Sequence, residues 1–144
     1  MIESDTIKLL RECDAGIKMG VKSIEQVWKY ARSMELKRAL ENSRKEHEKL
    51  EKVIRKALDR FSDQGKNPSK MAETMSWLKT NVSLTFDDED STIADLMTDG
   101  CNMGIKSLRR YLNQYKAADE DSKTIAEKLI DSKKKLMESM ADFL

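Results

Sequence analysis

The stretch GIKMGVKSI at Gly16–Ile24 returns as GCNMGIKSL at Gly100–Leu108, 84 positions later in a chain of 144 residues. Five of the nine residues are identical, and two others exchange Val for Ile and Ile for Leu. Each copy lies within a segment whose apolar residues recur every three or four positions. An aromatic-rich end, a turn and another long segment follow each copy. We interpret this pattern as two helical hairpins that arose by internal duplication and pack about a pseudo-two-fold axis.

Apolar residues at helical spacing form the two long segments of the first hairpin. One stripe runs from Leu10 to Ala31, and a second runs from Leu36 to Phe61 in alternating steps of four and three. No Gly or Pro separates the two stripes. A turn near residues 33–35 is therefore inferred without a local signal, and one continuous helix is the alternative interpretation.

The second half of the chain is divided more clearly. Gly65 and Pro68 end the second stripe. A shorter helix is predicted over residues 69–82. The acidic run that ends at Asp90 is expected to interact favourably with the positive N-terminal end of the dipole of the next helix. Asp90, Ser91 and Thr92 are expected to cap that helix, and Ser122 is expected to cap the last one.

The predicted fold is an all-α, ferritin-like four-helix bundle in a single domain, residues 1–144. Hairpin 1 covers about residues 5–62, the crossover with its short extra helix covers about 63–90, and hairpin 2 covers about 91–144. The long helices have about 23–29 residues, or roughly 35–43 Å. A long crossover lets the chain run back along the bundle before the second hairpin begins.

Composition excludes several classes of function. The chain has 27 basic and 26 acidic residues and a net charge of +1, which gives no field to attract nucleic acid or an anionic membrane. No apolar run reaches the ~18 residues of a membrane span. The two isolated cysteines, Cys13 and Cys101, and an N-terminus unlike a signal peptide predict a reduced, cytoplasmic protein.

The chain resembles the ferritin-like superfamily. A break from Gly65 to Pro68 after the second helix, and Trp77-Leu78-Lys79 within the crossover, make it similar to small bacterial ferritin-like families of about this length. The resemblance covers nearly the whole chain. It implies a di-iron site built from a Glu on helices 1 and 3 and a Glu-x-x-His on helices 2 and 4.

Most of those ligands are missing. The only histidine, His47, lies on the inward stripe of the second helix, with Arg44 three residues before it. Lys133 is the counterpart of His47 in the last helix, and the first and third helices offer only Asp14 and Thr98 at this level. We therefore expect a polar core layer of Asp14, Arg44, His47, Thr98 and Lys133, with no metal and no other cofactor.

The glycine pairs of the repeat have a predicted role in packing. Gly16 and Gly20, like Gly100 and Gly104, are four residues apart and so share a helix face. A glycine within a helix costs ~1 kcal/mol relative to alanine. We expect the four to let the first and third long helices approach closely.

The expected function is non-catalytic, through self-association into a homo-oligomer or through another protein partner. Candidate anchors are the aromatic residues Trp28, Tyr30, Trp77, Tyr111 and Tyr115. The alternative is a metal-binding redox or iron-handling protein that holds iron or manganese. Its reduced ligand set would be Asp14, His47, Glu51 and Asp99. A third possibility is a haem or small-molecule site in the core that uses His47 and a methionine.

Overall fold

Helices make up most of the computed structural model, which describes residues 4–69, 71–83 and 89–144. They are α1 (Asp5–Trp28), α2 (Met34–Asp59), α3 (Met71–Ser83), α4 (Glu89–Gln114), α5 (Glu120–Met140) and a final 3-10 turn, η1 (Ala141–Phe143). No strand occurs in these residues, so the predicted all-α class is confirmed.

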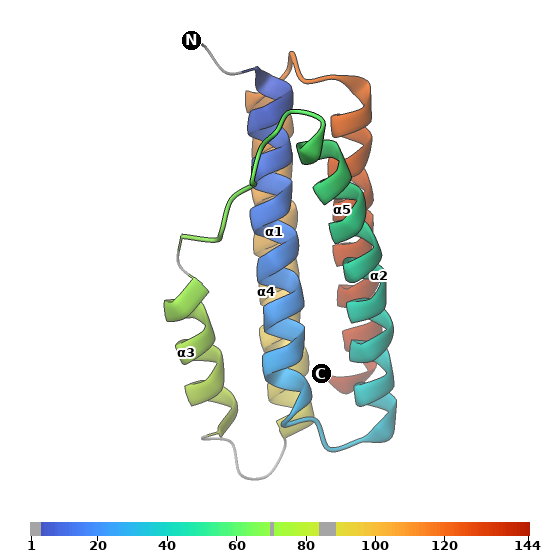
Figure 1. Cartoon of the computed structure of the whole chain (residues 1–144). Coiled ribbons are helices and arrows are strands. Elements are labelled where there is room, and N and C mark those ends of the chain that lie inside the picture. The colour runs from blue at the N-terminus through green and yellow to red at the C-terminus, as the bar shows by residue number, and fades with distance from the viewer. Residues whose placement is uncertain (1–3, 70, 84–88) are drawn as a thin grey trace.

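The four long helices lie side by side as two antiparallel hairpins, α1 with α2 and α4 with α5 (Figure 1). The connection after α2 runs back along the outside of the bundle and includes α3, which packs on α1 and α4. As a result, α2 and α4 run in the same direction. The hairpins meet mainly where α2 packs on α5, with further contacts from α1 to α4 and α5.

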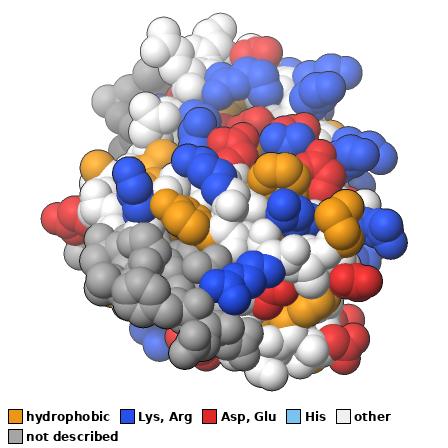
Figure 2. All heavy atoms as spheres, turned by 90° about the horizontal axis from the view of Figure 1, so that it is seen from below, with side chains coloured by type: hydrophobic (Ala, Val, Ile, Leu, Met, Phe, Trp, Pro, Cys, Tyr) orange, Lys and Arg blue, Asp and Glu red, His pale blue; other side chains and the backbone are white. Residues whose placement is uncertain are grey.

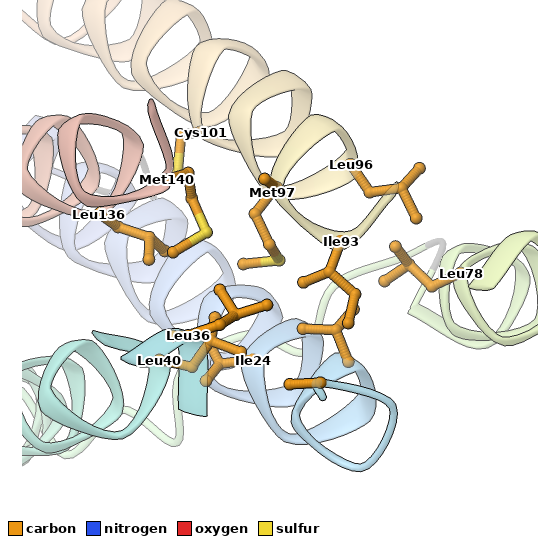
Figure 3. Close-up of a cluster of buried hydrophobic side chains, with 13 residues drawn as sticks. Ile24, Leu36, Leu40, Leu78, Ile93, Leu96, Met97, Cys101, Leu136 and Met140 are labelled. Carbon is orange, nitrogen blue, oxygen red and sulfur yellow. The ribbon is translucent and has the colours of Figure 1, made fainter. Parts of the chain in front are cut away.

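The bundle has two hydrophobic clusters, one in each half of its length. The first lies near the α1–α2 turn, where Leu78 of α3 approaches Ile93 and Leu96 of α4 (Figure 3). The second lies at the other end and is built around Leu9, Ile54 and further buried side chains: Leu10, Cys13, Ile17, Ala57, Leu58, Leu108, Ala118, Ile125, Ala126, Leu129 and Ile130. The core is therefore not continuous along the bundle.

The turn between α1 and α2 is held by a residue distant in sequence. The Ser33 hydroxyl caps α2 by accepting from the Leu36 N–H at 3.1 Å. The Asp90 carboxylate of α4 accepts from the backbone N–H groups of Arg32 at 2.7 Å and Ser33 at 3.0 Å. Burial opposes ionisation of Asp90, but these donors outweigh it and lower its pKa. The interpretation as one continuous helix is wrong.

Three of the predicted helix starts also differ from the structure. Helix α5 begins at Glu120, because Asp119 is its cap and accepts from the Ser122 N–H at 2.8 Å. Helix α4 begins at Glu89, so Asp90 lies within its first turn and does not precede it. The short crossover helix starts at Met71, two residues later than predicted. Asp87 and Asp88 of the acidic run lie outside the described residues.

The surface mixes both signs of charge. Figure 2 looks onto the end of the bundle that carries the α1–α2 turn, where basic and acidic side chains alternate with small, separate hydrophobic areas. Within the described ranges, no helix combines the length and the apolar character that crossing a membrane requires.

Asp90→Ala should lower the free energy of unfolding by about 1–2 kcal/mol, because two backbone donors at the α1–α2 turn lose their acceptor. Urea unfolding at pH 7 measures the change. Asp99→Ala, at an exposed position of the same helix, is the matched control and should stay within about 0.5 kcal/mol of the unsubstituted chain. Equal effects of the two substitutions would contradict this role of Asp90.

Candidate functional site

A polar layer separates the two hydrophobic clusters at the middle of the bundle. Along α2, the buried residues pass from Leu40 in one cluster through His47 to Ile54 in the other. Along α5, Lys133 lies between Ile130 and Leu136, which belong to different clusters. His47 is 1% exposed and Lys133 is 7% exposed. The only histidine of the chain thus shares the centre of the core with a buried lysine.

The hydrogen bond of His47 assigns the tautomer of its neutral imidazole ring. Its Nδ1 lies 2.8 Å from the backbone carbonyl oxygen of Ser43, one turn earlier in α2. A carbonyl only accepts, so we assign the ring proton to Nδ1 and the lone pair to Nε2. Nε2 is buried and has no hydrogen-bond partner in the structure. His47 therefore presents an unused acceptor to the layer.

Two glycines leave the space that these side chains occupy. A Cβ atom on Gly20 of α1 would lie 3.2 Å from His47 Nε2 and 3.3 Å from Lys133 Nζ. A Cβ atom on Gly104 of α4 would lie 2.8 Å from Lys133 Cδ. Both distances to Gly20 are measured to a single point, so the two nitrogen atoms lie no more than 6.5 Å apart (3.2 Å plus 3.3 Å). The two glycines occupy equivalent positions in the repeated stretch.

The other two glycines behave differently. A Cβ atom on Gly16 would make an ordinary contact, 3.7 Å from Leu129 Cδ2, and one on Gly100 would meet nothing within 4 Å. The prediction that the four glycines bring α1 and α4 close together is therefore wrong, because none of their Cβ positions meets the other of these two helices. At Gly20 and Gly104 the closest neighbours are side chains of α2 and α5, so the glycines accommodate a lysine and a histidine between the helices.

Burial governs the electrostatics of the layer. It lowers the pKa of Lys133 from its ordinary 10.5, while the thiols of Cys101 and Cys13 act weakly in the other direction. Burial first, and then the charge of Lys133, lower the pKa of His47 to about 4. Burial raises the pKa of Cys101 to about 11 and is also the main cause that raises that of Cys13 to about 12. At neutral pH the imidazole and both thiols are uncharged.

Asp14, the buried acid predicted for this layer, serves another part of the molecule. Its Oδ2 accepts from Lys18 Nζ at 2.7 Å and from the backbone N–H of Lys66 at 2.9 Å, and Arg55 lies 3.7 Å from its Oδ1. It also lies against Gly65, whose φ of +84° favours glycine. Asp14 therefore fastens the segment after α2 onto α1, and its predicted place in the polar layer is wrong.

That segment carries further contacts that sequence reasoning missed. Asp63 Oδ2 pairs with Arg11 at 2.7 Å, and Asp63 Oδ1 accepts from the Gly65 N–H at 2.8 Å. The hydrogen bonds from Arg11 are the main cause that lowers the pKa of Asp63. Lys66 adds an ion pair with Glu12 at 2.6 Å. Asp-Gln-Gly after a helix is a recognisable turn signal, but its partners on α1 are distant in sequence.

The remaining predicted residues also lie apart from the layer. Arg44 pairs with Glu41 at 2.8 Å on the partly exposed side of α2, and the Thr98 hydroxyl donates to the Ala94 carbonyl of its own helix at 2.7 Å. Asp99 is exposed and Glu51 is half-buried. Among the described residues, no group of three or more His, Cys, Asp or Glu side chains could hold a metal ion. Only His47 and Lys133 of the predicted layer come together.

The chemistry available to this pair is limited. A metal centre needs several anionic or neutral donor atoms, whereas the layer offers one neutral imidazole nitrogen beside the ammonium group of Lys133. No described carboxylate pairs with Lys133. What the two groups can do is gain or lose protons within the buried core.

Comparisons of the chain with protein-family models, with curated proteins and with solved structures give no match. The resemblance to the ferritin-like superfamily therefore stays a prediction. Any proposal about function has to be argued from the bundle and its polar layer.

His47→Leu should leave the free energy of unfolding at pH 7 unchanged or raise it by up to roughly 2 kcal/mol, because it removes a buried acceptor that has no partner. Leu40→Ala, on the same stripe and fully buried, is the control and should cost about 2–5 kcal/mol. Two results together would contradict this structural role of His47. They are a large loss of stability in His47→Leu and the reversal of that loss by added iron or manganese.

Gly100→Ala and Gly104→Ala form a matched pair on one helix. Both gain the same helix propensity, but only the Cβ at position 104 collides with Lys133. We expect Gly100→Ala to stabilise the chain by roughly 0.5–1 kcal/mol, and Gly104→Ala to be less stable than Gly100→Ala by about 1–3 kcal/mol. Thermal unfolding of the two variants side by side tests this, and equal stabilities would contradict the packing described here.

Proposed function

We propose that this chain is a ferritin-like bundle with a degenerate metal site, and that it acts without catalysis, by binding protein and above all by self-association. The polar layer carries this proposal. At the level where ferritin-like proteins would hold two cations between carboxylates, the centre of this bundle contains a lysine and a histidine. A buried ammonium group opposes cation binding, and the buried acid of α1 is committed to the crossover segment.

The arrangement of the helices also supports the proposal. Two antiparallel hairpins joined by a connection that runs back along the bundle correspond to ferritin-like connectivity (Figure 1). Gly20 and Gly104, at equivalent positions of the repeated stretch, both border Lys133. This correspondence favours a duplication of one hairpin.

Exposed aromatic side chains suggest where a partner binds. Trp28 is 40% exposed and stacks under the Lys37 ammonium at 5.2 Å, and Trp77 on α3 is 54% exposed. Tyr111 and Tyr115 stack on each other with ring centroids 6.2 Å apart and pack against the core. Large, exposed aromatic groups are typical anchors of protein interfaces, so the two tryptophans are better candidates than the tyrosines.

The test measures mass and metal content on the same preparation, grown with iron and manganese present. We expect light scattering to show a defined oligomer. Trp28→Ala or Trp77→Ala should weaken it by about tenfold or more, because anchor residues carry most of the energy of an interface. Val53→Ala removes a comparably exposed apolar group from α2 and should leave the oligomer unchanged.

Elemental analysis should show far less than one metal ion per chain. Stoichiometric iron or manganese that disappears in His47→Leu would overturn the degenerate site and favour the iron-handling alternative. A chain that stays monomeric over the whole accessible concentration range would overturn self-association.

A further inference from the structure

The polar layer lies across the interface between the two hairpins. His47 belongs to α2 in the first hairpin, and Lys133 belongs to α5 in the second. These two helices form the most extensive contact between the hairpins. Any electrostatic repulsion between the two side chains therefore acts directly on the surface that joins the hairpins.

The helices that enclose the pair provide no charge to compensate it. From α1 comes the thiol of Cys13, and from α4 comes the thiol of Cys101, and both are neutral in acid. The buried carboxylate of Asp14 is bonded to Lys18 and to the crossover segment. Helix α3 packs on α1 and α4 and adds no described charged group to the layer.

The neighbours on α2 and α5 themselves do not compensate the pair either. One turn from His47, Arg44 is engaged with Glu41. Glu51, one turn further along α2, is half-buried, and it is not among the groups that shift the pKa of His47 or Lys133. One turn from Lys133, the residues are apolar: Leu129, Ile130, Leu136 and Met137. A proton gained by His47 thus adds a second positive group to a buried layer that contains no acid.

We propose that the His47–Lys133 layer is a proton-sensitive switch, in which protonation of His47 puts like charges on the two hairpins and opens the bundle between them. The switch works by local electrostatics and does not depend on the function proposed above. Buried histidines that must become charged are a general cause of acid-induced opening.

The sign and range of the effect follow from proton linkage. The pKa of His47 is about 4 in the folded chain and 6.5 when it is exposed. Between these values the open or unfolded chain binds a proton that the folded chain does not, so stability falls as pH falls. The ratio of folded to open chain should decrease by about tenfold per pH unit over this range. Asp63 and Asp90, whose pKa values lie below 3.8, lose their stabilising ionisation only at lower pH.

The first measurement reads the imidazole directly. His47 is the only histidine, so its ring protons give one unambiguous set of NMR signals. We expect an apparent pKa close to 4 in the folded chain and near 6.5 in urea. Lys133→Met should raise the folded value part of the way, because it removes the neighbouring charge but keeps the burial. Lys134→Met, the exposed neighbour, is the control and should leave the value unchanged. A folded-state value near 6.5 would overturn the proposal.

The second measurement detects the opening. Cys13 on α1 and Cys101 on α4 are buried and serve as internal reporters of separation between the hairpins. Because the reactive thiolate becomes rarer in acid, the labelling rate with 4,4′-dithiodipyridine is divided at each pH by the rate for the same thiols in the urea-unfolded chain. This ratio should rise by about tenfold per pH unit as the pH falls from 6.5 to 4.5. In His47→Gln, whose side chain stays neutral, this rise should be absent.

Urea unfolding over the same pH range separates opening from complete unfolding. If the thiols are labelled faster than the rate of complete unfolding permits, the hairpins separate before the chain unfolds. Labelling that only keeps pace with complete unfolding, or an equal acid response in His47→Gln, would overturn the switch. If His47→Gln does not fold, the comparison of Lys133→Met with Lys134→Met in the NMR titration still decides the outcome.

Discussion

Lys133 is buried at the centre of the bundle, where no carboxylate of the described residues pairs with it, and the arrangement of the surrounding helices depends on how that cost is met. Removing an ammonium group from water without a counter-ion is strongly unfavourable, and a protein usually responds by lowering its pKa. Here Gly20 and Gly104 provide room for the lysine stem, and the neighbouring imidazole and thiols stay neutral. The hydrophobic clusters on either side then pack without interruption within each half of the bundle.

The chain places its buried acid and its buried bases in different parts of the fold. Asp14 is fully buried, yet its oxygens are used by Lys18, Lys66 and Arg55, where the segment after α2 crosses α1. That ionic contact fixes the start of the crossover and so helps to set the order of the helices. Because the acid is committed there, the central layer keeps its basic character and becomes sensitive to protons.

This separation is the reason why the resemblance to ferritin-like proteins does not transfer a function. A bundle of two hairpins can host many sites, and activity follows from the residues in the site. Among the described residues of this chain, the centre of the bundle holds no group of carboxylates that could bridge metal ions. The same helix geometry therefore supports a proposal based on binding and on proton-linked opening.

The sequence by itself determined the helices, because apolar spacing and polar caps act within a few residues of one another. The α1–α2 turn was inferred near residues 33–35 without a local signal, and the structure places it at residues 29–33. Its position depends on a distant partner, because the carboxylate that holds Ser33 is Asp90, 57 residues away. The sequence placed His47 opposite Lys133, but it could not tell that Asp14 faces the crossover segment instead of this layer. Each residue turns a helix by about 100°, so small differences in rotation and packing decide which polar groups meet. Only the tertiary structure settled that choice, because it depends on contacts between segments far apart in the chain.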